Sequence, residues 1–344
     1  GAEYLSKNVT WSSLEELFLS NNSIGNKGIS ALSNNTSWGN LKQLGVSKNF
    51  VTSSGCLNLS SNLRWPLQIL ELGDNIMIGV EGVLNLIQSK AILNLQEFYL
   101  QNTNLTDKGV ASLSQNTSWS NLKVLNLAFN KISVLGIADL VQSDDWVSVE
   151  DLDLSANSIG PAGVAELSKS KAFSNLRTLN LFNTSLGEQG ASILSENLTW
   201  NHLQHLNLSH NSIGDRGAAS LSENSTWKEL QSLNLGSNRI GREGITGLCK
   251  SAIWSTSLRE LSLRNNSVDS EAAEELSSNA SWANLQKFDL GYNLIGDQGA
   301  EALSKNAVWI NLRVLDLSTC NVGIEGAEKL CRNKNWINFQ TLNL

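Results

Sequence analysis

The chain of 344 residues repeats one motif along its whole length, and this repetition limits its fold more than any other feature. Pairs of apolar residues separated by one residue recur thirteen times; nine of the twelve intervals are 27 residues, and the other three are 26, 28 and 28. Such a period is typical of a solenoid, in which each unit buries its apolar face only against its neighbours. We therefore expect a single solenoid over residues 1–344.

Each repeat has the pattern of a short strand, a turn and a short helix. In residues 206–208, alternation of apolar and polar residues predicts a strand with one buried face. An Asn such as Asn211 follows, and stacked side chains at this position can bond the turning backbone of the neighbouring repeat. The next segment has apolar residues three to four positions apart, which predicts a helix of about two turns. Three repeats replace the Asn, with Thr103, Thr184 and Cys320.

Polar residues mark both ends of the predicted helices. Asp215 and Asp297 lie where a carboxylate favours a helix N-terminus, and Pro161 suits a first helical turn. A second Asn follows each of seven helices, and we expect it to end the helix in the left-handed conformation. These residues are Asn35, Asn116, Asn197, Asn224, Asn279, Asn306 and Asn333.

Tryptophan is the most frequent aromatic residue, with eleven Trp against eight Phe and three Tyr. Every Trp lies six residues after the helix Leu of its repeat, and Ile92 and Phe173 fill this place in the two exceptions. Because one such residue recurs in each repeat, we interpret the tryptophans as a stacked, inward-pointing column that buries about 150–250 Å² per ring.

The pattern L-x-x-L-x-L-x-x-[N/T/C]-x-[I/L/V] resembles that of leucine-rich repeats, and the helix and the 27-residue length are similar to the ribonuclease-inhibitor-like class. The helix start G-A-x-x-L-S is similar to bacterial repeats of the GALA type. The resemblance covers essentially the whole chain. It implies an α/β solenoid of about 13 repeats, a horseshoe with a parallel β-sheet on its concave face and helices on its convex face. It indicates little about function, because this scaffold carries many unrelated binding tasks.

Composition excludes several functional classes. The net charge of −7 argues against nucleic acid, whose phosphate backbone favours clustered Lys and Arg. No apolar run reaches the roughly 18 residues of a membrane span. The four Cys have neither disulfide density nor metal-ligand spacing, which favours a reducing intracellular environment. No phosphate-binding loop, nucleophile elbow or zinc-binding motif occurs, so we expect no enzyme, cofactor or metal.

A binding surface is expected among the outward-facing residues of the concave face, because these vary while the scaffold does not. Exposed aromatic residues on rigid strands are favoured interface anchors. We expect Tyr99, Phe129 and Phe182 to form an aromatic patch, with His205 and His210 as polar neighbours. A second, charged patch is expected from Arg264, Asp289, Tyr292 and Asp316, with Asp153 as a further outward carboxylate.

Two features of these patches resemble a metal site or an acid–base pair, but we assign neither function. The three His lie in one repeat, but His202 belongs to the preceding loop and His210 lies beyond a turn, so a metal site is not expected. Asp289 and Asp316 are expected about 5 Å apart on adjacent strands, close enough to raise the pKa of one carboxyl.

The leading hypothesis is a non-enzymatic scaffold that binds a protein partner on its concave face. The GALA resemblance implies a bacterial protein, secreted as an effector into the host cytoplasm. Two alternatives remain open. Ribonuclease-inhibitor-like repeats include activators of Ran GTPase, which are described as using loop Asn and Arg residues, and Arg239 and Arg242 lie near such a loop.

The other alternative is a structural role. Gly1–Trp11 matches Gly299–Trp309, so the chain begins inside a repeat and shows no polar capping repeat, although solenoids usually need one. We therefore expect a segment of a longer protein, or ends that stack end to end with other copies.

Overall fold

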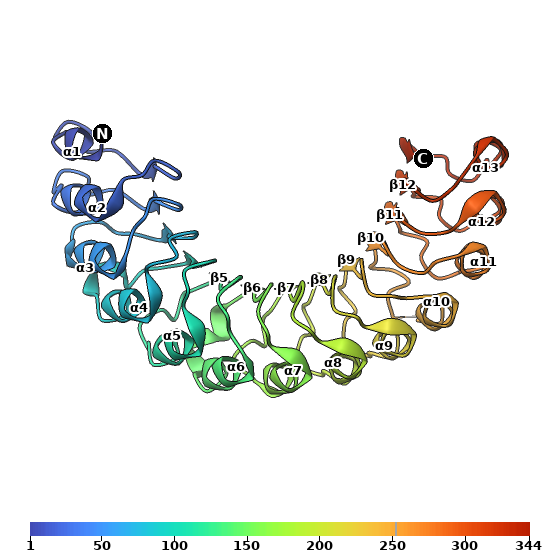
Figure 1. Cartoon of the computed structure of the whole chain (residues 1–344), viewed down its shortest axis with the longest axis horizontal. Helices are drawn as coiled ribbons and strands as arrows, with labels where there is room; N and C mark the ends of the chain where they lie inside the picture. The colour runs from blue at the N-terminus through green and yellow to red at the C-terminus, as the bar shows by residue number, and fades with distance from the viewer. Residues whose placement is uncertain (252) are drawn as a thin grey trace. The chain divides into compact units, whose positions relative to one another are not determined.

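A computed structural model describes residues 1–251 and 253–344, in which short strands alternate with helices (Figure 1). The residues form two compact units. Unit 1 contains Gly1–Ser158 and Ser170–Leu176, and unit 2 contains Ile159–Lys169 and Arg177–Leu344.

In unit 1, six parallel strands pair in chain order, with the apolar residue of each strand opposite that of the next, as in Leu17 and Leu44. The strands are β1 (Glu16–Phe18), β2 (Gln43–Gly45), β3 (Ile69–Glu71), β4 (Glu97–Tyr99), β5 (Val124–Asn126) and β6 (Asp151–Asp153). The helices are α1 (Ala2–Ser6), α2 (Gly25–Ser33), α3 (Ser53–Ser61), α4 (Gly79–Ile87), α5 (Thr106–Leu113) and α6 (Val134–Leu140), with short 3₁₀ helices at Lys90–Ile92 and Asp144–Ser148.

In unit 2, seven parallel strands pair in the same way. The strands are β7 (Thr178–Asn180), β8 (His205–Asn207), β9 (Ser232–Asn234), β10 (Glu260–Ser262), β11 (Lys287–Asp289), β12 (Val314–Asp316) and β13 (Thr341–Asn343). The helices are α7 (Gly160–Lys169), α8 (Gly187–Ser195), α9 (Gly214–Leu221), α10 (Arg242–Cys249), α11 (Ser270–Ser277), α12 (Gly296–Leu303) and α13 (Ile324–Cys331).

The expected architecture of one parallel strand and one short helix per repeat is confirmed in both units. In each unit the strands form one layer and the helices form another (Figure 1). The middle residue of an internal strand, such as Leu125 or Leu206, points into the space between the layers and is 0–3 % exposed. Its two neighbours point away from the helices, so every strand presents two side chains on what we call the sheet face.

The tryptophan column is confirmed as buried structure. Ten of the eleven Trp side chains are 0–7 % exposed, and Ile92 and Phe173 in the same place are fully buried. Trp11, at 44 % exposed, is the exception. The indole N–H of Trp119 donates to the carbonyl of Ile92 at 2.9 Å, whereas in the described residues nine other indole N–H groups have no acceptor. The rings therefore stabilise the fold mainly through the apolar area that they bury.

The Asn ladder after the strands is also confirmed, and Asn130 shows its bonding. Its Oδ1 accepts hydrogen bonds from the backbone N–H groups of Thr103 and Leu105, at 3.0 and 3.1 Å, and its Nδ2 donates to the carbonyl of Leu100 at 2.7 Å. One side chain thus satisfies three backbone groups of the preceding repeat. Thr184 and Cys320 replace part of this bonding, each donating to a carbonyl, of Leu181 and Leu290 respectively.

The second Asn of the repeat does not behave as expected. Asn35 and its counterparts are absent from the residues with positive φ, so the prediction of left-handed helix ends is wrong. Instead, Nδ2 of Asn35 donates to the carbonyls of Ser6 and Asn8, both at 2.8 Å, and its Oδ1 accepts from the N–H of Ser37 and Trp38. This side chain forms a second buried ladder. Because this bonding needs an Asn in each repeat, and Ser or Thr often stands two residues later, the sequence N-x-S/T recurs along the chain.

Asp215 and Asp297 lie in the first turns of α9 and α12, as expected, but their main bonds reach the following repeat. Oδ1 of Asp215 accepts from the N–H groups of Gly241 and Gly244, at 2.6 and 3.0 Å. Each carboxylate therefore caps the next helix as well as favouring its own N-terminus.

Among the described residues, no helix is long and apolar enough to cross a membrane.

Candidate functional site

The predicted site residues are divided between the two units. Unit 1 holds three of them, on the sheet face and in the turns beside it: Tyr99, Phe129 and Asp153. Unit 2 holds the other seven: Phe182, His205, His210, Arg264, Asp289, Tyr292 and Asp316. Each group is described within its own unit.

Tyr99 lies at the end of β4 on the sheet face of unit 1. Its hydroxyl donates a hydrogen bond to Oε2 of Glu97 at 2.8 Å, so the ring lies along the strand. Partial burial raises the pKa of the Tyr99 phenol, and the hydrogen bond and charge of Glu97 raise it further. Tyr99 therefore stays neutral and offers an oriented aromatic face.

Phe129 does not lie on a strand but in the turn after β5, with its side chain 57 % exposed. Three further apolar residues in the turns after β2 and β3 are equally exposed: Phe50 at 74 %, Ile76 at 59 % and Met77 at 69 %. Sequence reasoning missed them because it considered aromatic residues only around the strands. For Phe50 and Ile76 the signal was present, since each directly follows a ladder Asn, at a position where most repeats carry Ser or Asn.

The outward carboxylates have a local role that the sequence pattern did not indicate. Oδ1 of Asp153 accepts the backbone N–H of Ser155 at 2.8 Å, and Oδ1 of Asp289 accepts that of Gly291 at 3.0 Å. Asn207 bonds the N–H of Ser209 in the same way. A side chain that bonds the backbone two residues on is the usual device of Asn and Asp at turns. These residues therefore shape the strand end as well as the surface.

Phe182 and His210 form one side-chain pair in unit 2. Their rings are 5.0 Å apart and nearly perpendicular, which is a favourable edge-to-face arrangement. His205 lies on β8 with its side chain exposed, and His202 contacts Oε1 of Glu229 at 3.3 Å through Nδ1. In the described residues, no group of three His, Cys, Asp or Glu side chains is placed to hold a metal ion.

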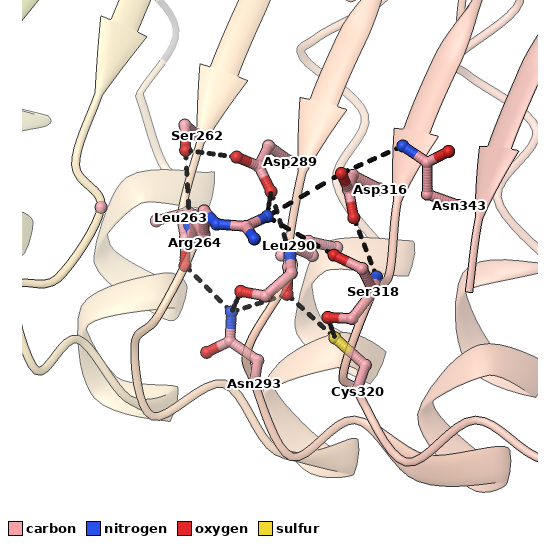
Figure 2. A network of polar contacts seen from close by, with 12 residues as sticks. Ser262, Leu263, Arg264, Asp289, Leu290, Asn293, Asp316, Ser318, Cys320 and Asn343 are labelled. Carbon is pink, nitrogen blue, oxygen red and sulfur yellow. Dashed lines mark hydrogen bonds and ion pairs between the residues drawn. The ribbon is translucent and has the colours of Figure 1, made fainter.

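Arg264 organises the charged patch (Figure 2). Its Nη1 lies 3.4 Å from Oδ1 of Asp289 and 3.8 Å from Oδ2 of Asp316, and its guanidinium carbon lies 4.4 Å from the centre of the Tyr292 ring. The structure thus brings together all four residues predicted for this patch. The ion pairs and the cation–π contact fix one orientation of the arginine.

Residues that the sequence did not single out complete this network. Ser262 donates to Oδ2 of Asp289 at 3.0 Å, and Asn343 donates to Oδ2 of Asp316 at 3.1 Å (Figure 2). Gly291 leaves the space for the guanidinium, because an added Cβ there would lie 2.5 Å from Nη1 of Arg264 and 2.8 Å from Oγ of Ser318.

The expected raised pKa in this carboxylate pair is contradicted at Asp316. Burial alone would raise the pKa of Asp316, but the hydrogen bonds from Ser318 and Asn343 and the charge of Arg264 outweigh it and hold the pKa below its ordinary value. The expectation considered only the two like charges. The hydrogen bonds from Ser318 and Asn343, together with the charge of Arg264, reverse the sign.

A shallow concavity of about 280 Å³ lies beside this network on the sheet face of β9–β12. Its lining includes Asn234, Ser262, Asp289 and the ion pair between Lys287 and Glu260, whose Nζ and Oε1 are 2.6 Å apart. The charges at this place are largely paired within the protein, so the surface is polar and ordered.

The arginines considered for GTPase activation differ in their surroundings. Arg239 is exposed in the turn after β9, whereas Arg242 begins α10 and is bound by Glu271 and Glu275. The cysteines are unpaired, and burial raises the pKa of the Cys56 and Cys249 thiols to about 12. Neither thiol is therefore an activated nucleophile.

A family model described as "Leucine Rich repeat" matches the chain in eight segments, which together cover just over half of it. They are residues 12–33, 120–141, 147–168, 201–222, 229–249, 255–277, 283–304 and 310–331. No curated protein sequence matches the chain.

Solved structures with a similar fold have low sequence identity. A chain of the yeast Rad7–Elc1 complex is similar at 17 % identity and a TM-score of 0.55. The match covers 96 % of this protein and 79 % of that chain. The chain of a TLR13–ssRNA13 complex gives 19 % identity and a TM-score of 0.53, and this protein spans 52 % of its length. An internalin, InlF of Listeria monocytogenes, gives 16 % identity and a TM-score of 0.50 over 93 % of its chain. At these identities the likeness concerns the fold alone.

Proposed function

The chain belongs to the leucine-rich repeat family, and we propose that it is a protein-binding module without catalytic chemistry of its own. The observation that carries this proposal is the ordered state of the outward side chains. Arg264 is held by two carboxylates and an aromatic ring, and Phe182 is held against His210. Because these side chains are already fixed, they lose little conformational entropy when a partner contacts them.

Aromatic and arginine side chains on a rigid support are the usual centres of protein interfaces. We place the binding site of unit 2 on Phe182, His205 and His210 and on the network around Arg264. Tyr99, Phe129 and Asp153 belong to the corresponding surface of unit 1. We chose these residues because their side chains project from the sheet face or from the turns beside it.

A protein partner fits this surface better than a nucleic acid does. TLR13 is described in complex with single-stranded RNA, but that likeness concerns the fold alone. In this chain the net charge is −7, and the guanidinium of Arg264 is engaged by Asp289 and Asp316. A polyphosphate chain would have to displace those carboxylates.

The finer predictions from the sequence form part of the same proposal. The helix start similar to GALA-type repeats supports a bacterial protein that acts on host proteins. The alternative of GTPase activation is less well supported, because the guanidinium of Arg242 is paired with Glu271 and Glu275.

The test is affinity capture with covalent cross-linking, comparing the wild type with sheet-face variants. We expect Phe182→Ala with His210→Ala, and separately Arg264→Ala, to reduce capture of the same protein at least tenfold. Lys108→Ala and Arg216→Ala, on the exposed faces of α5 and α9, are the matched controls and should leave capture unchanged.

Unchanged capture by all sheet-face variants, with circular dichroism showing that they fold, would contradict the proposed function. Sedimentation velocity at several concentrations tests the end-to-end alternative. Open-ended growth of the wild type with concentration would favour assembly over partner binding.

A further inference from the structure

One surface of unit 1 is apolar although it lies outside the sheet face. It consists of Phe50, Ile76, Met77 and Phe129, flanked by Lys48 and Lys131, and we call it the edge surface. The two phenylalanines each lie between buried residues: Asn49 and Val51 flank Phe50, and Ala128 and Asn130 flank Phe129. The edge surface is therefore made by single side chains that turn away from a packed interior. Exposed apolar patches of this kind mark interaction sites.

The backbone also disfavours the two phenylalanines in the free protein. Phe50 and Phe129 have φ values of 58° and 57°, in the left-handed region where a bulky side chain is strained. Other turns of unit 1 place Asn at these positions, as Asn102 and Asn104 show. Asn tolerates this conformation, so the scaffold does not require Phe. Both the strain and the exposure lower the stability of the chain alone, and strained residues of this kind cluster at functional sites.

A groove of about 280 Å³ lies within the part of the edge surface that contains Ile76 and Phe129. Ile76 and Phe129 line it on either side, and Asn102, Asn104 and Lys131 complete it. The polar groups of the groove are partly satisfied within the protein, because Nζ of Lys131 donates to Oδ1 of Asn104 at 3.0 Å. The groove therefore offers apolar walls and a cationic end.

Charge decides what kind of segment fits here. Lys48 lies two residues before Phe50, and Lys131 lies two residues after Phe129, and both lysines are exposed. The carboxylate of Asp74, in the turn after β3, accepts a hydrogen bond from Nδ2 of Asn102 at 2.9 Å. The edge surface thus presents two lysines and one hydrogen-bonded carboxylate, which complements an acidic partner.

We propose that the edge surface binds a polypeptide segment whose apolar residues are flanked by carboxylates. Ile76 and Phe129 belong to turns two repeats apart, which corresponds to about 10 Å at the usual strand spacing. In a polyproline II segment, side chains three positions apart lie on the same side and about 9 Å from each other. The segment therefore carries two apolar side chains three positions apart. This inference rests on the proposed function and names the chemistry of one partner segment.

The experiment uses fluorescent twelve-residue peptides and measures anisotropy. The first peptide has two Leu three positions apart between Asp and Glu residues; the second replaces both Leu by Ser; the third replaces every acidic residue by Lys. We expect the wild type to bind the first peptide at least tenfold more tightly than the other two. Binding of the first peptide should weaken with added salt, because screening reduces the contribution of the lysines.

The decisive variant is Phe50→Asn with Phe129→Asn. It should bind the first peptide at least tenfold more weakly while its melting temperature stays the same or rises, because Asn suits the left-handed turns. Thr319→Asn is the matched control, since Thr319 occupies the turn position of Phe129 in unit 2 with φ 58° and is exposed. It should leave peptide binding unchanged. Lys48→Gln with Lys131→Gln should weaken binding and flatten its salt dependence.

Several results would overturn the inference. They are equal binding of the three peptides, no binding of the first at millimolar concentration, unchanged binding by the double Asn variant, or a lower melting temperature for it. A wild-type dimer that the double Asn variant dissolves would show a second copy on the edge surface instead. If the peptide fails while captured partners still depend on Phe182 or Arg264, the proposed function stands and this inference alone falls.

Discussion

The edge surface of unit 1 and the Arg264 network of unit 2 share one turn position of the repeat, but the aromatic side chain at that position has different contacts in the two units. Phe129 and Tyr292 hold the same turn position, with φ values of 57° and 59°. Phe129 is open to solvent beside a groove, whereas Tyr292 supports the guanidinium of Arg264 at 4.4 Å. In unit 1 the aromatic side chain of the turn is exposed beside the groove, and in unit 2 it contacts a neighbouring side chain.

The difference shows that the repeat fixes backbone conformation and leaves surface chemistry free. In both units, ladder Asn residues bond the same backbone groups, so the turns have the same geometry. What varies is the side chain that the turn presents. Three predictions separate the shared scaffold from the differing surfaces, beginning with the largest expected effect.

Removing a ladder side chain should be equally damaging in the two units. Asn130→Ala in unit 1 and Asn211→Ala in unit 2 each leave two N–H groups of the preceding repeat without their acceptor. We expect each variant to lose about 3–5 kcal/mol of unfolding free energy, since each unsatisfied buried group costs about 1–3 kcal/mol. Urea denaturation measures this loss. Costs that differ by more than twofold would show that the scaffold is not equivalent in the two units.

Replacing a buried Trp by Phe should distinguish the units. Trp119→Phe in unit 1 loses the hydrogen bond to Ile92, whereas Trp227→Phe in unit 2 removes an indole N–H that has no acceptor. We expect the Trp119 variant to be less stable than the Trp227 variant by about 1 kcal/mol, the usual value of one hydrogen bond. Phe173, fully buried in the same place, shows that the column accepts Phe. Equal thermal denaturation of the two variants would contradict this difference.

The smallest effect concerns acid stability in unit 2. Because the folded state lowers the pKa of Asp316, its contribution is present above the ordinary aspartate pKa and is lost as the pH falls through the lowered value. Asp316→Asn should therefore destabilise the protein by up to about 1 kcal/mol at pH 7. The difference between wild type and variant should vanish well below pH 3.8, the ordinary value.

Denaturant titrations at several pH values measure the acid effect, and Arg264→Gln provides its control. In that background, Asp316→Asn should cost less at neutral pH, because the charge that helps to lower the pKa is gone. A full cost that persists without Arg264 would assign the effect to Ser318 and Asn343 alone.

Much of the fold could be predicted because the same sequence pattern occurs thirteen times along the chain. The Leu pairs located every strand, and the constant place of Trp separated structural tryptophans from surface aromatics. Asn35 shows the limit. Its place at the end of a helix suggested a residue in the left-handed conformation. The side-chain amide instead bonds the carbonyls of Ser6 and Asn8, which lie in the preceding repeat and come within reach only when two repeats stack.

The candidate sites were predicted in part for a similar reason. Arg264, Asp289, Tyr292 and Asp316 could be grouped because they lie at known positions on adjacent strands or directly after them. The role of Gly291 was not visible, since a missing side chain matters only where a neighbour's guanidinium needs the space. Phe50 and Ile76 were missed because their exposure depends on which way a turn directs them.

The sequence by itself determined the period, the order of strand and helix, and which residues form the core, because these depend on spacing along one chain. The tertiary structure decided how charges pair and which turn residues reach solvent. Arg264 lies 25 residues before Asp289 and 54 before Ser318 in the sequence, and only the parallel stacking of β10, β11 and β12 brings them together. Electrostatic and surface properties act through space, so they follow the stacking of the repeats and not the order of the residues.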